Sequence, residues 1–194
     1  MRSTPEHLPE HLRATVGLRV DLIDTPALVV DLDAMERNIQ RMAEFAHKHQ
    51  VRWRPHAKMH KSAEIALQLE KAGARGHCVQ KVSEAEALAA GGVADLYISN
   101  EVLAGAKLLR AARLAAQLAA RGGRLAIAVD SEEGLTRLAE AMRVAGSDAG
   151  IDVFVEIDVG QGRCGVPPGP AALALAQAVA AQPRLHFAGL QAYH

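Results

Sequence analysis

Short apolar and β-branched runs alternate along the chain with longer segments rich in Ala, Leu, Glu and Arg. Short apolar runs are typical of buried strands, whereas apolar positions that recur every three or four residues are typical of helices. The predicted strands are Ala27–Leu32, Val51–His56, Gly76–Gln80, Asp95–Ser99, Leu125–Val129, Ile151–Asp158 and His186–Ala192. The pattern therefore predicts a chain of about seven β-α units.

Helical periodicity fills the segments between these strands. The predicted helices are Leu32–His49, Ser62–Ala72, Ser83–Ala90, Val102–Arg121, Ser131–Ala145 and Ala171–Ala181. Some helix ends carry local signals, because Ser83-x-x-Glu86 has the form of a capping box and Gly91–Gly92 is typical of a helix end. Repeated β-α units require parallel strands, so the sheet is either open and doubly wound or closed into a (β/α)8 barrel.

Two features favour an α/β fold of the TIM-type (β/α)8 barrel class. Seven consecutive units suit a barrel, and the turn Asp31–Ala34 lacks the glycine that a phosphate loop after the first strand of an open sheet requires. A barrel needs eight strands and about 250 residues, so we predict an incomplete barrel of about seven units. Residues 1–24 are predicted to be an N-terminal extension and residues 25–194 the barrel domain.

Composition narrows the class of partner. The chain is 49% hydrophobic and balances 22 basic against 22 acidic residues, which excludes a disordered chain. Because the chain has no dense basic stripe, we do not expect a nucleic acid or a membrane surface as its partner. We expect a small molecule or another copy of the chain instead. The polar N-terminus does not resemble a signal peptide, and two cysteines are too few for a secreted disulfide framework, so we expect a cytoplasmic protein.

Charged and apolar residues alternate with a period of two over residues 51–58. One parity contains Arg52, Arg54, His56 and Lys58. If this face points into the barrel, Lys58 lies at its mouth beside His56, where burial and neighbouring cations favour the uncharged, nucleophilic amine. The alternative is a solvated edge strand with a charged surface.

Two further motifs suggest other ligands. His56 and His60 have the spacing of paired metal ligands on a helix, but Pro55 places them at a strand end and no third ligand follows nearby. The segment Gly160–Gly165 spells G-x-G-x-x-G, yet the prolines after it prevent a helix from starting at its third glycine. What remains is a loop that presents Arg163 either to a phenolate or carboxylate or simply to solvent.

Five motifs in order resemble the D-threonine aldolase and D-serine dehydratase family, which shares the fold-type III pyridoxal phosphate barrel of alanine racemase. They are TPALVVDLD (residues 25–33), RPHAKMHKS (54–62), QKVSEAE (80–86), EIDVGQGRCG (156–165) and GLQAYH (189–194). The resemblance implies that Lys58 binds pyridoxal 5'-phosphate covalently, with His56 beside it. It also implies that Arg163 approaches the cofactor's phenolic oxygen and that Tyr193 stacks against its ring.

The resemblance also implies an activity. It favours a lyase that cleaves D-3-hydroxy amino acids, such as D-threonine or 3-hydroxyaspartate, to glycine and an aldehyde. Glu156 stands where racemases commonly have a lysine, which disfavours plain racemisation. D-serine dehydratase-like and racemase activities remain alternatives, and a non-catalytic pyridoxal phosphate carrier is an alternative of another class.

The family pattern extends beyond the residues present in this chain. Members continue through an eighth strand and phosphate-binding loops into a C-terminal β domain that supplies ligands for a divalent metal. The resemblance therefore implies that this chain corresponds to the amino-terminal portion, that it contains no metal ligands of its own, and that the full-length protein is a homodimer acting on a small D-amino acid.

Overall fold

The computed structural model describes residue 10 and residues 15–194, and the chain divides between Met42 and Ala43 into two compact units. The first unit includes a short 3-10 turn, η1 (Val20–Leu22), and the start of helix α2 (Leu32–Lys48). The predicted boundary between residues 24 and 25 stays a prediction. None of the described helices is both long and apolar enough to cross a lipid bilayer.

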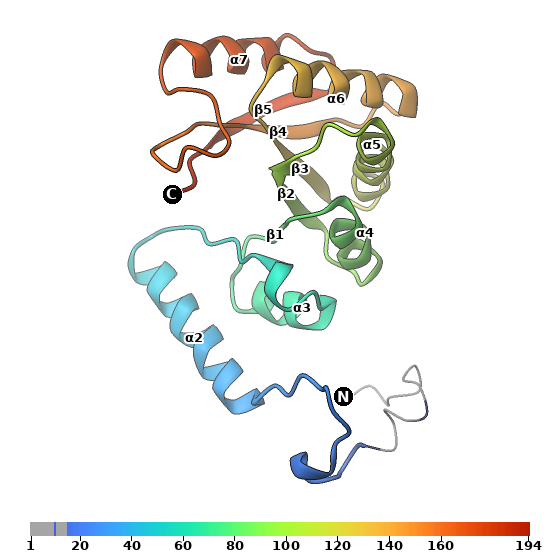
Figure 1. The fold of residues 1–194 in the computed structure, drawn as a ribbon, viewed down its shortest axis with the longest axis vertical. Coiled ribbons are helices and arrows are strands. Elements are labelled where there is room, and N and C mark those ends of the chain that lie inside the picture. The colour runs from blue at the N-terminus through green and yellow to red at the C-terminus, as the bar shows by residue number, and fades with distance from the viewer. Residues whose placement is uncertain (1–9, 11–14) are drawn as a thin grey trace. The chain divides into compact units, whose positions relative to one another are not determined.

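The second unit alternates helices and strands (Figure 1). After α2 its elements are η2 (Ala57–Met59), α3 (Ala63–Lys71), β1 (His77–Val79), α4 (Val82–Ala90), β2 (Asp95–Glu101), α5 (Gly105–Ala119), β3 (Arg124–Val129), α6 (Glu132–Ala145), β4 (Ile151–Glu156), α7 (Pro170–Ala180) and β5 (Leu185–Gln191). All six predicted helices are confirmed, with ends shifted by at most a few residues.

The strands form one parallel sheet in the order β1-β2-β3-β4-β5. The predicted α/β class is confirmed, but the count of about seven strands is wrong for the described residues. Residues 27–31 form no strand, and residues 51–55 run extended beside β1 with one isolated bridge, from His56 to Cys78. An apolar or alternating run becomes a strand only when its backbone groups pair with a neighbour along its length, which a sequence pattern cannot show.

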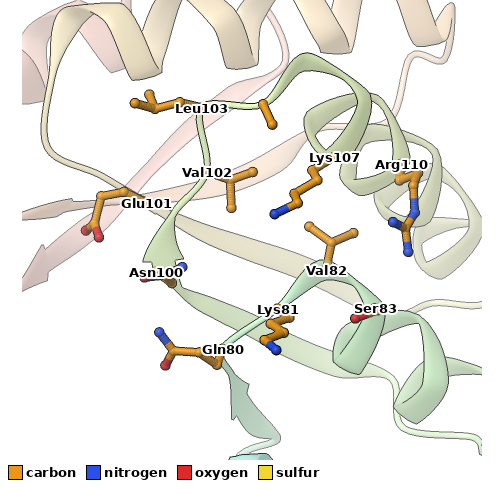
Figure 2. A pocket seen from close by; sticks show the side chains of 11 residues that line it. Gln80, Lys81, Val82, Ser83, Asn100, Glu101, Val102, Leu103, Lys107 and Arg110 are labelled. Atoms are coloured by element: carbon orange, nitrogen blue, oxygen red, sulfur yellow. The ribbon is translucent and has the colours of Figure 1, made fainter.

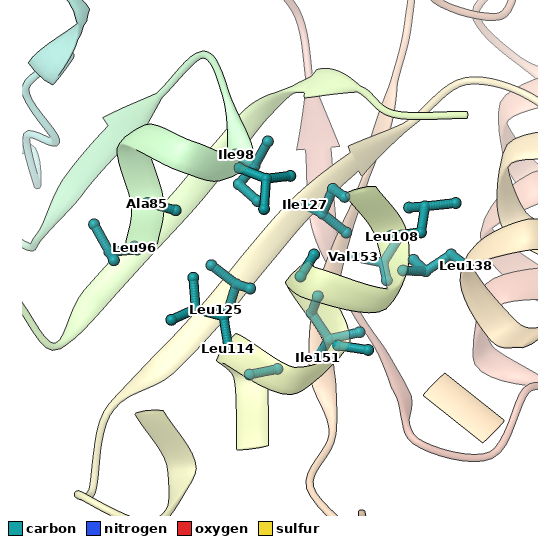
Figure 3. Close-up of a cluster of buried hydrophobic side chains, with 14 of the residues drawn as sticks. Ala85, Leu96, Ile98, Leu108, Leu114, Leu125, Ile127, Leu138, Ile151 and Val153 are labelled. Atoms are coloured by element: carbon teal, nitrogen blue, oxygen red, sulfur yellow. The ribbon is translucent and has the colours of Figure 1, made fainter. Parts of the chain in front are cut away.

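Alternate residues of each strand face opposite sides of the sheet. The side covered by helices is apolar, and Figure 3 shows Leu96, Ile98, Leu125, Ile127, Ile151 and Val153 packed with helical side chains there. The other side carries a smaller cluster of Tyr97, Ala126 and Ala128, with Cys78 and Phe154 against it. We call these the helix face and the cleft face of the sheet.

Helix α5 illustrates how the sequence pattern produces the helix face. Leu108, Ala111, Ala115 and Leu118 recur at spacings of three and four residues, and all are buried. Such spacing places the side chains on one stripe of the helix, which can then cover the sheet. The stripe of α5 packs against β3 and its neighbours, so burial of apolar area stabilises this layer.

The predicted capping box at Ser83-x-x-Glu86 is wrong. Helix α4 begins one residue earlier, and the Glu84 carboxylate accepts hydrogen bonds from the backbone N–H groups of Gln80 (2.9 Å) and Lys81 (3.2 Å). Glu86 instead forms an ion pair with Arg110. An acidic residue in the first turn satisfies the free backbone donors of a helix whichever position it occupies, so two nearby glutamates made the sequence signal ambiguous.

Candidate active site

A cleft of about 460 Å³ opens on the cleft face towards the carboxyl ends of the strands. It is lined by Lys58, His56, Arg163 and Tyr193, the four residues that the sequence analysis selected, although they come from three distant segments. The carboxyl ends of parallel strands in a β-α sheet are where ligands commonly bind. The cleft is therefore the candidate active site.

Lys58 lies on η2, a 3-10 helix of one turn, and not on a strand, and its side chain is exposed. The predicted burial of this lysine is therefore wrong, because the chain turns away from β1 directly after His56. The predicted alternation nevertheless holds, since Arg54, His56 and Lys58 all line the cleft while Ala57 between them is buried. An amine that is attached to a short turn and open to the cleft can reach a carbonyl group bound there.

His56 holds this turn in place. Its Nδ1 accepts a hydrogen bond from the backbone N–H of Lys58 (3.2 Å), while its Nε2 lies 3.3 Å from the Ser99 hydroxyl. A ring that accepts at Nδ1 carries its proton at Nε2, so it donates to Ser99, which in turn donates to the Val79 carbonyl oxygen (3.5 Å). Burial, followed by the nearby charge of Lys58, lowers the pKa of His56. Burial, the charge of Lys58 and the hydrogen bond accepted at Nδ1 favour the neutral ring, and they outweigh the opposing effects of Glu84 and Gln80. The neutral ring fixes the turn that carries Lys58.

Arg163 is presented by a loop that closes on itself after β4. Asp158 donates its backbone N–H to the Val166 carbonyl oxygen (3.0 Å), and its side chain accepts hydrogen bonds from the backbone of Gly160 (2.9 Å) and Gly162 (3.0 Å). These backbone donors lower the pKa of Asp158. A helix does not start at the third glycine of the motif, as predicted, since α7 begins only at Pro170. The loop is ordered by hydrogen bonds of its own backbone.

One glycine of this loop cannot be replaced. Gly165 has a positive φ of 100°, and a Cβ atom there would lie 2.5 Å from the backbone nitrogen of Asp158. Its N–H donates to the Asp130 carboxylate at the end of β3 (3.1 Å). The conformation that only glycine adopts readily thus brings the loop against the neighbouring strand.

Arg163 and Tyr193 meet in the cleft. The guanidinium carbon of Arg163 lies 5.4 Å from the centre of the Tyr193 ring, within the range of a cation–π interaction. Two residues that lie 30 positions apart in the sequence therefore form one planar, positively charged surface beside the turn of Lys58. Such a surface suits a flat aromatic ligand with an anionic oxygen.

No sequence pattern described above predicts the hydrogen-bonded polar floor of the cleft. The Tyr97 hydroxyl donates to the Gln191 side-chain oxygen, and the Gln191 amide donates to the Glu156 carboxyl group. Glu101 lies beside Glu156, and both line the cleft. Strand parity could have identified them, because each occupies an inward position near the carboxyl end of its strand.

Both cysteines lie near the cleft, and neither carries the signs of a nucleophile. Burial raises the pKa of Cys78 to about 11, and burial followed by the charge of Glu101 raises the pKa of Cys164. A raised pKa keeps the thiol protonated at neutral pH and therefore unreactive.

A second cavity of about 350 Å³ adjoins the cleft, with which it shares Gln80, Asn100 and Glu101 (Figure 2). Lys81 and Lys107 line it, and both side chains are exposed. The cleft is thus flanked by two exposed cations, which attract anionic small molecules. The sequence analysis missed this cavity because its walls come from two separate β-α turns.

The candidate metal pair at His56 and His60 is not supported. Among the described residues, the potential ligand atoms that lie close together belong to Glu101, Asp130 and Cys164, within 4.8 Å of one another, and neither histidine belongs to that set. His60 instead accepts a hydrogen bond from the Ser62 backbone N–H (3.1 Å). Both histidines serve the backbone around η2.

The family model described as the alanine racemase N-terminal domain matches residues 30–194. That match agrees with the predicted incomplete barrel, which has five strands in the described residues instead of seven. The chain is 49% identical over 172 residues to a D-threonine aldolase of an Arthrobacter species, covering 89% of this chain and 44% of that protein. It is 45% identical over 181 residues to the 3-hydroxy-D-aspartate aldolase of Paracoccus denitrificans, covering 93% and 45%.

Solved structures give the same result. The crystal structure of D-threonine aldolase from Filomicrobium marinum superposes with a TM-score of 0.81 at 49% identity, covering 87% of this chain and 44% of that one. The D-threo-3-hydroxyaspartate dehydratase from Delftia sp. HT23 superposes with a TM-score of 0.75 at 34% identity, covering 88% and 44%. The chain therefore spans less than half the length of these relatives.

Proposed function

The chain belongs to the alanine racemase N-terminal domain family, and on this premise we propose that it is the cofactor-binding part of a pyridoxal phosphate-dependent lyase. The proposed reaction cleaves a D-3-hydroxy amino acid to glycine and an aldehyde. The observation that supports this most directly is the meeting of Lys58, Arg163 and Tyr193 in one cleft. The named activities of two relatives with at least 45% identity agree with it.

The residues of the cleft fit pyridoxal 5'-phosphate. Lys58 offers a primary amine for the aldehyde group, Arg163 offers a planar cation for the phenolic oxygen, and Tyr193 offers an aromatic surface for the ring. Bound there, the cofactor would stabilise the electron pair released when a bond to the substrate's α carbon breaks. The support for this fit is that Lys58, Arg163 and Tyr193 line one cleft of about 460 Å³.

The chain's own residues can perform the remaining tasks. Neutral His56 orients the turn of Lys58 through its hydrogen bond to the backbone N–H. The amine of Lys58 holds or releases a proton at Nζ as it enters or leaves the reaction. Arg163 orients the anionic ring oxygen, and the lysines of the adjoining cavity draw the carboxylate of an amino acid towards the cleft.

A divalent metal is part of the same proposal. In an aldol cleavage the metal would polarise the β-hydroxyl group of the substrate while that group loses its proton. We propose that its ligands lie outside this chain, in the part of the longer relatives that this chain does not span. The prediction is that a chelator abolishes cleavage by the full-length protein without releasing pyridoxal phosphate.

The decisive experiment identifies products. The full-length protein, loaded with pyridoxal phosphate, is incubated with D-threonine and with D-3-hydroxyaspartate, and each product is quantified by chromatography. Glycine plus an aldehyde supports the aldolase. Inversion at the α carbon as the single change, which gives L-allo-threonine from D-threonine, would instead indicate a racemase, and absence of any product from a loaded protein would favour a non-catalytic carrier.

Dehydration is a second candidate because the chain resembles a hydroxyaspartate dehydratase at 34–38% identity. The products would then be ammonia and a keto acid, which the same experiment detects. We further propose a cytoplasmic homodimer as the full-length form, which light scattering at working concentration tests directly.

A further inference from the structure

The carboxyl groups of Glu101 and Glu156 lie together at the floor of the cleft. Strand β2 pairs Ile98 with Ile127 and then, after an irregularity, Glu101 with Ala128. The bulge places Glu101 level with Ala128, whose partner on β4 is Phe154, two residues before Glu156. Because Ala128 of β3 is small, the two longer side chains can meet above it. Bulges commonly re-aim a side chain near an active site. Glu156 is the more enclosed of the two, with only 4% of its surface exposed.

If both carboxyl groups were ionised, a buried oxygen of Glu101 would lack a hydrogen-bond donor. The two groups are within hydrogen-bond reach of each other, yet an oxygen of Glu101 is buried and has no partner. Two carboxylates cannot bond to each other because neither has a hydrogen to donate. A single proton held by Glu156 supplies the missing donor, and it also removes one of three negative charges, since Asp130 lies nearby.

The neighbouring hydrogen bonds run in one direction that suits a protonated Glu156. Tyr97 donates to the side-chain oxygen of Gln191, and the Gln191 amide then donates to the Oε2 atom of Glu156. Glu156 therefore has one oxygen that accepts, and the other is free to carry a proton towards Glu101. Every group in the row is satisfied when one proton lies between the two glutamates.

We propose that Glu101 and Glu156 share one proton and carry one negative charge between them at neutral pH, and that Glu156 is the uncharged partner. The pair acts as a positioning unit for both sides of the cleft. On one side Glu156 accepts a hydrogen bond from Gln191 of β5, and on the other a carboxylate oxygen of Glu101 lies within 4.8 Å of the Cys164 sulfur, next to Arg163. The shared proton thus links β5 to the Arg163 loop.

The electrostatics of the site support this arrangement. Burial, followed by the hydrogen bond and charge of Glu101, raises the pKa of Glu156 to about 8. The groups that face it are Glu101 on β2, Asp130 after β3, Tyr97 and Gln191 on neighbouring strands, and Cys164 with Arg163 on the loop. Above pH 8 the proton leaves, and a second negative charge develops at the floor.

The shared proton is independent of the proposed function, but its effect on ligands rests on that function. Pyridoxal phosphate is an anion, so a second negative charge beneath it disfavours binding. One pH unit above the pKa only about one molecule in ten keeps the proton, so affinity for pyridoxal phosphate should fall roughly tenfold between pH 7 and pH 9. Glu156→Gln keeps an uncharged donor and should lose this pH dependence.

Infrared difference spectroscopy on the protein without cofactor tests the proton directly. The wild type should show a protonated carboxyl band at pH 7 that titrates away near pH 8, and Glu156→Gln should lack it. Glu132→Gln, on an exposed site of α6, is the matched control and should keep the band. If no such band exists at pH 7, or if it persists in Glu156→Gln, the proposal is wrong.

A second variant guards against a folding defect at position 156. Glu101→Gln removes the neighbouring charge, so the Glu156 band should titrate at a lower pH; an unchanged midpoint would contradict the pairing. Binding of Mn²⁺ or Zn²⁺ that is lost in Glu101→Gln would also overturn the proposal, because a cation would then occupy the place of the proton. If the infrared band shows the shared proton but the protein does not bind pyridoxal phosphate, only the proposed function is wrong.

Discussion

The two faces of the one parallel sheet have opposite compositions. On the helix face, Leu125 and Ile127 of β3 are 1% exposed and surrounded by other aliphatic side chains. Under the cleft the same strand presents Ala126 and Ala128, which leave room for the larger polar groups of β2 and β4. A single strand thus contributes bulk to one layer and space to the other. Alternate residues of the same strand therefore pack in the core or border the cleft.

The largest expected effect concerns the cleft face. Lys58→Ala should abolish covalent attachment of pyridoxal phosphate while leaving the thermal melt almost unchanged, because Lys58 is exposed and packs against no core residue. Borohydride reduction followed by peptide mapping of the wild type measures the attachment. Lys61→Ala is the control, since Lys61 pairs with Glu84 at 3.5 Å. Label found on Lys61 or Lys81 would contradict the assignment.

The second effect concerns the helix face. Ile127→Ala should lower the free energy of unfolding by about 2–5 kcal/mol, because it opens a cavity among residues that are almost fully buried. Cys78→Ala, on the cleft face of β1, should cost far less, since it removes one atom that already borders the cleft. Urea denaturation of both variants gives the comparison. Equal losses would show that the two faces do not differ in packing.

The third effect is the pH dependence of the free energy of unfolding. The two faces contribute slopes of opposite sign. His77 on the helix face is fully buried, and burial lowers its pKa while its Nδ1 has no partner. The unfolded chain therefore binds more protons than the folded chain just below pH 6.5, so this group makes stability fall as pH falls through that range. His77→Gln should flatten the acid side of a stability profile measured by thermal melting.

Glu156 contributes the opposite slope. Its pKa is raised from 4.5 to about 8, so the folded chain binds more protons between these values and stability falls as pH rises through them. Glu156→Gln should remove this decline, whereas His77→Gln should leave it in place. The same melting series measures both, and a profile that changes identically in the two variants would rule out separate origins on the two faces.

The smallest effect tests the contact between Arg163 and Tyr193. Tyr193→Ala removes a cation–π interaction worth about 0.5–1 kcal/mol at an exposed site, so affinity for pyridoxal phosphate should fall roughly two- to fivefold through this contact. Tyr193→Phe keeps the ring and should bind nearly as well as the wild type. A loss in Tyr193→Phe equal to that in Tyr193→Ala would assign the effect to the hydroxyl group instead. Fluorescence titration is sufficient to separate these cases.

The helices were predictable because their apolar stripes repeat over many residues. The extended segment over residues 51–55 was not, because its alternation describes side chains while a strand requires paired backbone groups. Lys58, Arg163 and Tyr193 were found from their motifs, but the way His56 anchors the Lys58 turn depends on Ser99, a residue 43 positions away. Strand parity indicates that Glu101 and Glu156 face the same side, but their meeting across β3 also depends on the strand order and on the shifted register of β2, which the sequence pattern does not show.

The closed loop that presents Arg163 has an evolutionary consequence. Both ends are fixed on the same stretch of backbone, because Val166 donates to the Glu156 carbonyl oxygen (2.9 Å) and Asp158 donates to Val166. A segment anchored in this way can be exchanged as a unit without altering how β4 pairs with its neighbours. Changes inside the loop can therefore accumulate among related sequences while the sheet that supports it stays unchanged.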